Sequence, residues 1–215
     1  MSTNKPSEAV MILQLKVGDY KNFSYIVADA ATGEAAVIDP AWEVQLILEK
    51  LKERNLNLKF IVNTHAHLDH IEGNASLSSV TGAKVVMHAN SYAKKDIAVK
   101  DGGSLKVGKN AILHFIHTPG HSSESMCIIV NDIAIFTGDT LFVGECGRVD
   151  LPGGDANALY DSFEKLRSLD PKLALYPGHD YGNRPVSTLG EEIRSNYTLA
   201  KRTREEFVKF MLNES

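Results

Sequence analysis

Residues 64–70 of this chain read Thr-His-Ala-His-Leu-Asp-His, a dense group of side chains that can bind metals. The apolar residues before them predict a buried strand that runs straight into the histidines. If that strand continues to His67, then His65 and His67 project to one face, because side chains alternate along a strand. Asp69 and His70 then lie on the turn beyond its end. A polar loop with helix-capping residues is the alternative, but three histidines and an aspartate at this spacing favour a site for zinc, iron or manganese.

Three more ligand-type residues follow predicted strands later in the chain. His121 ends the run His-Thr-Pro-Gly-His, in which Pro119 and Gly120 interrupt the chain after a strand. Asp139 lies in Thr-Gly-Asp-Thr, and His179 ends Tyr-Pro-Gly-His, each again directly after a strand. Taken alone, each could be a turn or helix-cap residue. Together with the first cluster, they predict one site with enough ligands for two ions.

Hydrophobic periodicity predicts a mixed α/β protein. The predicted strands are residues 13–17, 24–28, 34–38, 58–64, 84–88, 111–116, 126–130, 133–137 and 173–176. Apolar stripes predict helices over residues 44–51, between residues 70 and 84, over residues 159–166, and from about Glu191 with Ile193, Tyr197 and Ala200 on one side. Strands followed by helices in both halves indicate two sheets packed face to face, with helices outside.

The composition of the chain limits its organisation and its partners. The 215 residues, 43% of them hydrophobic, fit one domain over residues 1–215, with residues 1–7 as a loose tail. A net charge of −4 gives no electrostatic reason to expect nucleic acid or a membrane surface as partner. No signal peptide or membrane span is recognisable. Two cysteines form no disulfide framework, so a cytoplasmic location is expected.

The order His-x-His-x-Asp-His, then His, Asp and His, resembles the metallo-β-lactamase superfamily over roughly residues 11–200. The resemblance implies a four-layer αββα sandwich of two mixed sheets with outer helices and the metals at one edge. It implies that one ion is bound by His65, His67 and His121, the other by Asp69, His70 and His179, with Asp139 bridging both.

Four later motifs are similar to glyoxalase II-like thioesterases and to persulfide dioxygenases. They are Phe-Thr-Gly-Asp-Thr-Leu-Phe (136–142), Cys-Gly-Arg-Val-Asp (146–150), Tyr-Pro-Gly-His-Asp-Tyr (176–181) and Ser-Thr-Leu-Gly-Glu-Glu (187–192). Glyoxalase II has a C-terminal helical domain that holds glutathione, and the 36 residues at positions 180–215 are too few for it. The resemblance is therefore to a short branch, and glutathione use stays open.

Two reactions follow from this resemblance. The preferred one is hydrolysis of an ester-type bond (a thioester, a lactone or, less favoured, a β-lactam) by a metal-bound hydroxide that Asp69 positions. It needs two divalent ions, zinc first, with iron or manganese as alternatives. The other is oxidation of a thiol persulfide to sulfite by one iron held by His65, His121 and Asp139. A non-catalytic metal-binding module and a nuclease are weaker interpretations.

The motifs around the ligands favour different reactions. The Cys-Gly-Arg and His-Asp-Tyr motifs favour the dioxygenase, whereas the residues around the first histidine cluster favour the hydrolase. In either case we expect a small-molecule substrate, and a homodimer is left open.

Three residues are candidates for substrate contacts. Arg148 could pair with a substrate carboxylate, or be an ordinary surface residue. Tyr181 follows His179 closely and could face the pocket. Cys146 matches a pocket position of the dioxygenases, although a lone cysteine is more often inert packing.

Other residues have structural interpretations. Asp39 could orient a ligand histidine or simply form the turn before a proline. His88, His114 and His117 match no family motif and are interpreted as structural, and Trp42 is expected to pack at a helix start.

Overall fold

The computed structural model describes residues 9–212, which form two six-stranded sheets. The first sheet has its strands in chain order: β1 (Val10–Val17), β2 (Asn22–Asp29), β3 (Glu34–Ile38), β4 (Asn57–Val62), β5 (Lys84–His88) and β6 (Ile97–Val99). The second runs in reverse order from β12 (Ser187–Thr188) through β11 (Ala174–Pro177), β10 (Ala134–Gly138), β9 (Met126–Val130) and β8 (Ala111–His117) to β7 (Ser104–Val107). The tail expected at residues 1–7 lies outside the described residues.

Both sheets are mixed, as predicted. In the first, β1, β2 and β3 pair antiparallel and β3 to β6 pair parallel. In the second, β10 and β11 pair parallel and the other neighbours antiparallel. Alternate residues of both sheets meet in one central core, for example Tyr25 and Val27 from β2 with Phe115, Ile128 and Phe136 from β8, β9 and β10.

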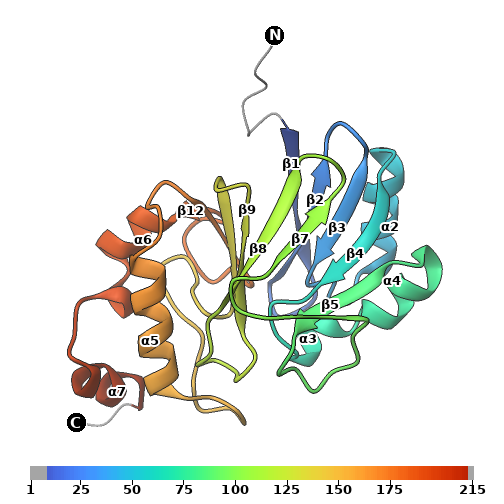
Figure 1. Cartoon of the computed structure of the whole chain (residues 1–215). Helices are drawn as coiled ribbons and strands as arrows, with labels where there is room; N and C mark the ends of the chain where they lie inside the picture. Colours follow the sequence, from blue (N-terminus) through green and yellow to red (C-terminus); the bar gives the residue numbers. More distant parts are fainter. Residues whose placement is uncertain (1–8, 213–215) are drawn as a thin grey trace.

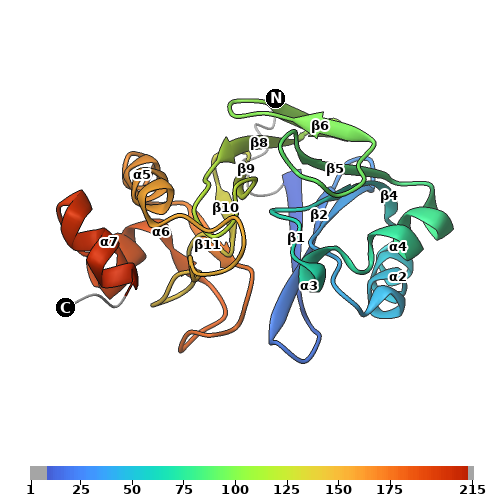
Figure 2. The ribbon, with the colours of Figure 1, turned by 90° about the horizontal axis from the view of Figure 1, so that it is seen from below.

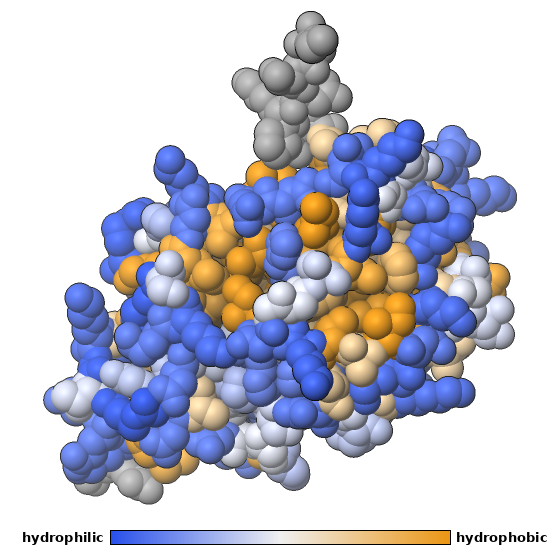
Figure 3. All heavy atoms as spheres, in the orientation of Figure 1, coloured by the Kyte–Doolittle hydropathy of each residue, from blue (hydrophilic) through white to orange (hydrophobic). Residues whose placement is uncertain are grey.

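Helices cover the outer face of each sheet, so that the chain forms the four layers that were predicted (Figure 1). On the first sheet, α2 (Val44–Glu53) and α4 (Asn74–Thr81) bury Ile47, Leu51 and Leu77. On the second, α5 (Ala156–Arg167) buries Leu159 and Phe163. Figure 3 shows one face of the molecule. Its apolar centre lies over the strands and is surrounded by polar residues.

The C-terminal segment is not the continuous helix that was expected. It forms α6 (Leu189–Ser195), the 3-10 turn η1 (Tyr197–Leu199) and α7 (Arg204–Leu212). Asn196 interrupts the helix because its side chain accepts a hydrogen bond from the N–H of Thr198 and donates to the carbonyl groups of Phe142 and Glu145. Its backbone is extended as a result, so Tyr197 does not continue the apolar stripe and is 52% exposed.

Strand β4 ends earlier than expected, at Val62, so His65 and His67 lie on the loop beyond it. The backbone N–H of Thr64 donates to the Asp39 carboxylate at 2.8 Å instead of to a neighbouring strand. The expected turn after the loop is one helical turn, α3 (Leu68–Ile71), which contains Asp69 and His70.

The loops after β4, β10 and β11 meet between the two halves of the molecule, as Figure 2 shows from below. The parallel strands of each sheet direct their carboxyl ends to this edge, which is where ligand sites of open α/β sheets commonly form. Within residues 9–212, no helix has the length and apolar character needed to cross a membrane.

Candidate metal centre

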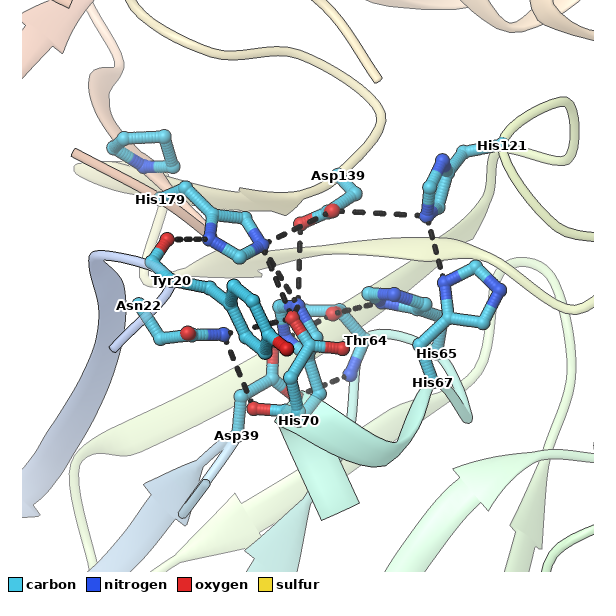
Figure 4. Close-up of polar contacts among 12 residues, drawn as sticks. Tyr20, Asn22, Asp39, Thr64, His65, His67, His70, His121, Asp139 and His179 are labelled. Atoms are coloured by element: carbon cyan, nitrogen blue, oxygen red, sulfur yellow. Dashed lines mark hydrogen bonds and ion pairs between the residues drawn. The ribbon is translucent and has the colours of Figure 1, made fainter. Parts of the chain in front are cut away.

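All seven predicted ligand residues come together at this edge (Figure 4 labels six of them). They come from five segments of the chain, the loop after β4, helix α3 and the loops that follow β8, β10 and β11. Their side chains form three overlapping groups, each with ligand atoms within 4.8 Å of one another: His65, His67 and His121; His65, His70 and Asp139; Asp69, His70 and His179. Residues up to 114 positions apart in the sequence thus share one site.

The first group consists of three histidine rings. Nδ1 of His67 lies 2.8 Å from Nε2 of His121, whose Nδ1 donates to the Arg148 carbonyl oxygen at 2.8 Å. Nε2 of His65 is buried and has no hydrogen-bond partner among the described residues. Burial, together with the nearby His70, holds the pKa of His65 well below its usual value, so its ring is neutral and free to act as a ligand.

Asp69, His70 and His179, called the second group from here on, combine two histidines with a carboxylate. The Nε2 atoms of His70 and His179 lie 3.3 Å apart. Oδ2 of Asp69 is 3.5 Å from the former and 3.4 Å from the latter. The Asp69 side chain is 24% exposed whereas both histidines are buried, so Asp69 faces the side from which a substrate can approach.

Asp139 lies between the two groups. Its Oδ1 is 3.3 Å from Nε2 of His70, and its Oδ2 is 3.3 Å from Nε2 of His179 and 3.6 Å from Nε2 of His121. Burial by itself would raise the pKa of Asp139, but the adjacent His70 and His179 hold it well below the usual range. The carboxylate is therefore charged and touches both groups.

These side chains fit divalent cations. Two imidazole nitrogens separated by 2.8 or 3.3 Å repel each other through their lone pairs unless a proton or a cation lies between them. Oδ1 of Asp139 is buried without a hydrogen bond from any described residue, like Nε2 of His65. Such unpartnered buried polar atoms are rare in proteins, and a bound ion is one way in which they are satisfied.

Asp39 contacts a ligand histidine and does not merely form the turn before Pro40. Its Oδ2 lies 3.0 Å from Nδ1 of His70 and accepts a hydrogen bond from the Thr64 hydroxyl, and its Oδ1 accepts one from the Thr64 backbone N–H. Burial would lower the pKa of His70, but Asp139 and Asp39 raise it well above its usual value. The contact between Asp39 and Nδ1 orients the His70 ring so that Nε2 faces the site.

Three further supports were not identified from the sequence. The Asn22 amide donates to Oδ2 of Asp69 at 3.0 Å, and the Tyr20 carbonyl oxygen lies 2.9 Å from Nδ1 of His179. Buried Glu124 accepts a hydrogen bond from the N–H of Ala66, between His65 and His67 in the chain. Of these three groups, only Glu124 could have been suspected from the sequence, because it is a single acidic residue before the apolar run of β9.

The three candidate substrate residues differ in their surroundings. Tyr181 stacks on His179, with ring centroids 4.7 Å apart and planes 3° apart. The Arg148 side chain is exposed and pairs with Asp150 at 2.5 Å. The Cys146 thiol packs 3.9 Å from Sδ of Met211, and burial raises its pKa to about 12. Tyr181 thus borders the metal centre, whereas the side chains of Arg148 and Cys146 are engaged elsewhere.

The remaining histidines and the tryptophan lie outside the metal centre. His88 is buried and stacks on His117 at 4.1 Å, and His114 is exposed on β8. Trp42 precedes α2 and lies 5.7 Å from the ring of Tyr20. None of these residues belongs to the three ligand groups.

The model of the metallo-beta-lactamase superfamily matches residues 17–179. The chain belongs to this superfamily. Its two mixed sheets with outer helices and its ligand order agree with that assignment, which confirms the resemblance seen in the sequence.

Members of the superfamily with different reactions resemble the chain. It is 31% identical to the probable polyketide biosynthesis zinc-dependent hydrolase BaeB of Bacillus velezensis, over 89% of this chain and 87% of that one. It is 40% identical to the hydroxyacylglutathione hydrolase of Polaromonas sp., over 75% of this chain but 63% of the relative. Human mitochondrial persulfide dioxygenase ETHE1 is 39% identical over 89% of this chain and 76% of its own length.

A solved structure of a related protein has the same fold as this chain. The crystal structure of ETHE1 from Myxococcus xanthus matches with a TM-score of 0.89 and 36% identity, covering 94% of this chain and 90% of that one. The chain is thus an enzyme of the superfamily, with both hydrolases and a dioxygenase among its relatives.

Proposed function

We propose that the chain is a hydrolase that holds two divalent ions, zinc in the first place, and cleaves a thioester or lactone of small molecules. The observation that supports this most directly is the position of Asp139, in contact with both ligand groups. One carboxylate between two groups of three ligands is an arrangement suited to two neighbouring ions.

Dedicated contacts within the second group support the same proposal. His70 is oriented by Asp39, His179 by the Tyr20 carbonyl oxygen and Asp69 by Asn22. Residues that hold metal ligands in position characteristically raise metal affinity. A single iron held by His65, His121 and Asp139 would leave these three ligands without a metal to bind.

Two ions bound here would lower the pKa of a shared water and polarise the substrate carbonyl group. Asp69 is a partly exposed ligand, and Asn22 fixes its Oδ2. Its carboxylate is placed to accept a hydrogen bond from the attacking water and to pass the released proton to the leaving thiolate or alkoxide. Water adds to the carbonyl carbon, the C–S or C–O bond breaks, and a carboxylate and a thiol or alcohol leave.

The second candidate is a persulfide dioxygenase. It is favoured by the likeness to human persulfide dioxygenase ETHE1 and to the Myxococcus xanthus structure. In that case one iron would be held by His65, His121 and Asp139, and a thiol persulfide, oxygen and water would be converted to sulfite and the free thiol.

The two functions differ in their dependence on His70. The protein is purified without added metal, its metals are quantified, and zinc- and iron-loaded samples are assayed with a thioester, a lactone and glutathione persulfide, anaerobically and in air. We expect two zinc ions per chain, hydrolysis without oxygen consumption, and near-complete loss of hydrolysis in His70→Ala. Oxygen-dependent sulfite formation by the iron form, unaffected by His70→Ala and without hydrolysis by any form, would replace the hydrolase by the dioxygenase.

A further inference from the structure

Exposed apolar side chains are concentrated around the metal centre. Within residues 9–212, nine large apolar or aromatic residues are exposed, and five of them border this site: Tyr20, Trp42, Leu68, Tyr92 and Tyr181. The other four, Val80, Ile112, Tyr197 and Leu212, are distributed over separate elements. Scattered apolar residues are ordinary on a protein surface, whereas a group of them at one place commonly marks a binding surface.

We call these five residues the apolar rim. Each of them lies next to a candidate ligand in the chain, contacts one, or contacts a residue that does. Tyr181 stacks on His179, and the backbone carbonyl of Tyr20 holds the same histidine ring. The ring of Tyr20 in turn contacts Trp42, and these two line a cavity of about 330 Å³ together with Gly18, Asp19 and Glu43.

The opposite side of the apolar rim lies against the loop that follows β4. Leu68 stands between His67 and Asp69 in the chain and is 64% exposed. The Tyr92 hydroxyl donates to the carbonyl oxygen of Ala66 at 2.9 Å while most of its ring is open to solvent. Both side chains are therefore exposed to solvent beside the loop and helix that carry His65, His67 and Asp69.

Cations bordering the site are engaged by carboxylates of the chain itself. Lys16 pairs with Asp180 at 2.6 Å, as do Arg148 with Asp150 at 2.5 Å and Arg184 with Glu191 at 2.7 Å. Lys21, in the turn between β1 and β2, and Lys94, near Tyr92 and Leu68, make no ion pair with a described residue. Because most cations at the site are paired with carboxylates of the chain, charge offers little for recognising a carrier with two carboxylates such as glutathione.

We propose that the apolar rim binds the apolar acyl group of the substrate, so that the enzyme prefers arylalkyl or medium-chain alkyl acyl compounds to small polar ones such as lactoyl-glutathione. The reaction itself rests on the proposed hydrolysis, but the binding preference does not. Each methylene group buried against the rim is expected to tighten binding by up to about fourfold. Flat aromatic groups gain further from offset stacking on Tyr20 and Tyr181.

Trp42, the single tryptophan of the chain, provides a direct measurement of binding. Non-hydrolysable S-methyl, S-hexyl and S-phenethyl thioethers of N-acetylcysteamine are titrated into metal-free and zinc-loaded protein, and tryptophan emission is followed, with calorimetry as a second measure of Kd. We expect the hexyl and phenethyl compounds to bind at least tenfold more tightly than the methyl compound in both forms. Tyr20→Ala and Leu68→Gln should each weaken this binding at least threefold, whereas Val80→Ala, which removes an exposed apolar side chain on α4, should not.

The possible outcomes distinguish the binding preference proposed for the apolar rim from the proposed hydrolysis. A preference for the apolar thioethers without hydrolysis of any thioester would uphold the rim and overturn the proposed function. Hydrolysis with equal affinity for methyl and hexyl compounds, or unchanged affinity in Tyr20→Ala and Leu68→Gln, would overturn the rim and leave the hydrolase in place.

Discussion

The carboxylate of Glu124 accepts a hydrogen bond from the backbone N–H of Ala66, 3.1 Å away and 58 positions earlier in the chain. Ala66 separates His65 from His67, and Glu124 lies three residues after His121. This hydrogen bond therefore joins the two loops that provide the first group of histidines.

The Glu124 contact predicts a selective effect on metal binding. Glu124→Ala leaves the buried N–H of Ala66 without an acceptor, which costs about 1–3 kcal/mol, and should lower the affinity of the first histidine group roughly tenfold or more. Glu124→Gln keeps an acceptor oxygen and should stay close to the parent protein. Competition with a chelator, read from the absorption of cobalt-substituted protein, measures both. Equal affinities for the alanine variant and the parent protein would show that the contact does not position the ligands.

Asp139 contacts both groups of ligands, so its removal should affect both ions. We expect Asp139→Ala to retain less than half of each ion, measured by elemental analysis after dialysis. Asp161→Ala, which removes an exposed carboxylate on α5 paired with Arg204, is the control and should keep the parent metal content. Loss of one ion with full retention of the other would argue against a bridging role.

Gly178 allows the close approach of β11 to Asp139. A Cβ atom at position 178 would lie 2.3 Å from Oδ1 of Asp139 and 3.0 Å from the Gly138 backbone. Gly178→Ala should therefore displace the carboxylate and weaken metal binding roughly tenfold, with a stability loss of about 1–3 kcal/mol. Gly82→Ala is a useful comparison, because its Cβ would meet no atom within 4 Å; it should be less stable while binding metal normally.

Asp29 predicts a pH-dependent contribution to stability that is independent of the metal centre. Its carboxylate accepts hydrogen bonds from the backbone N–H of Lys109, the Asn110 amide and the Thr32 hydroxyl, and so ties β2 to the turn between β7 and β8. Burial would raise the pKa of Asp29, but these bonds outweigh it and lower the pKa to about 2.

Because this value lies below that of about 3.9 in the unfolded chain, the charged form favours the folded state. The stabilisation should be complete above about pH 5 and disappear as the pH falls to about 2. Urea unfolding of the parent protein and of Asp29→Asn across this range should give midpoints that converge in acid. Glu205→Gln, which changes an exposed residue of α7, should show no such convergence. A constant difference at all pH values would mean that the charge of Asp29 is not responsible.

Local patterns in the sequence were sufficient to predict a mixed α/β protein with two sheets, the helix over residues 44–51 and the seven candidate ligands at strand ends, whereas the mixed pairing within each sheet came from the family resemblance. Strands with apolar alternation and ligand-type residues at their ends are local signals, because each depends on a few neighbours in the chain. The same patterns predicted that the strand at residues 58–64 would reach Thr64, beyond the end of β4 at Val62, and that the last helix would continue through Asn196. Both errors arose because a distant partner takes the backbone out of regular pairing, Asp39 at Thr64 and the carbonyl groups of Phe142 and Glu145 at Asn196.

Tertiary structure alone decided how the ligands are held and what surrounds them. Asn22 reaches Asp69 across 47 positions, and Tyr20 reaches His179 across 159. Such contacts cannot be predicted from residue type or spacing, because amide side chains are common and every residue has a backbone carbonyl group. The packing of the two sheets brings these groups to about 3 Å from the ligands, and it also brings Tyr20, Leu68 and Tyr181 from three separate segments of the chain around one site. Short sequence motifs thus determine which ligand types the site contains, whereas its geometry and its apolar surroundings depend on contacts between residues far apart in the sequence.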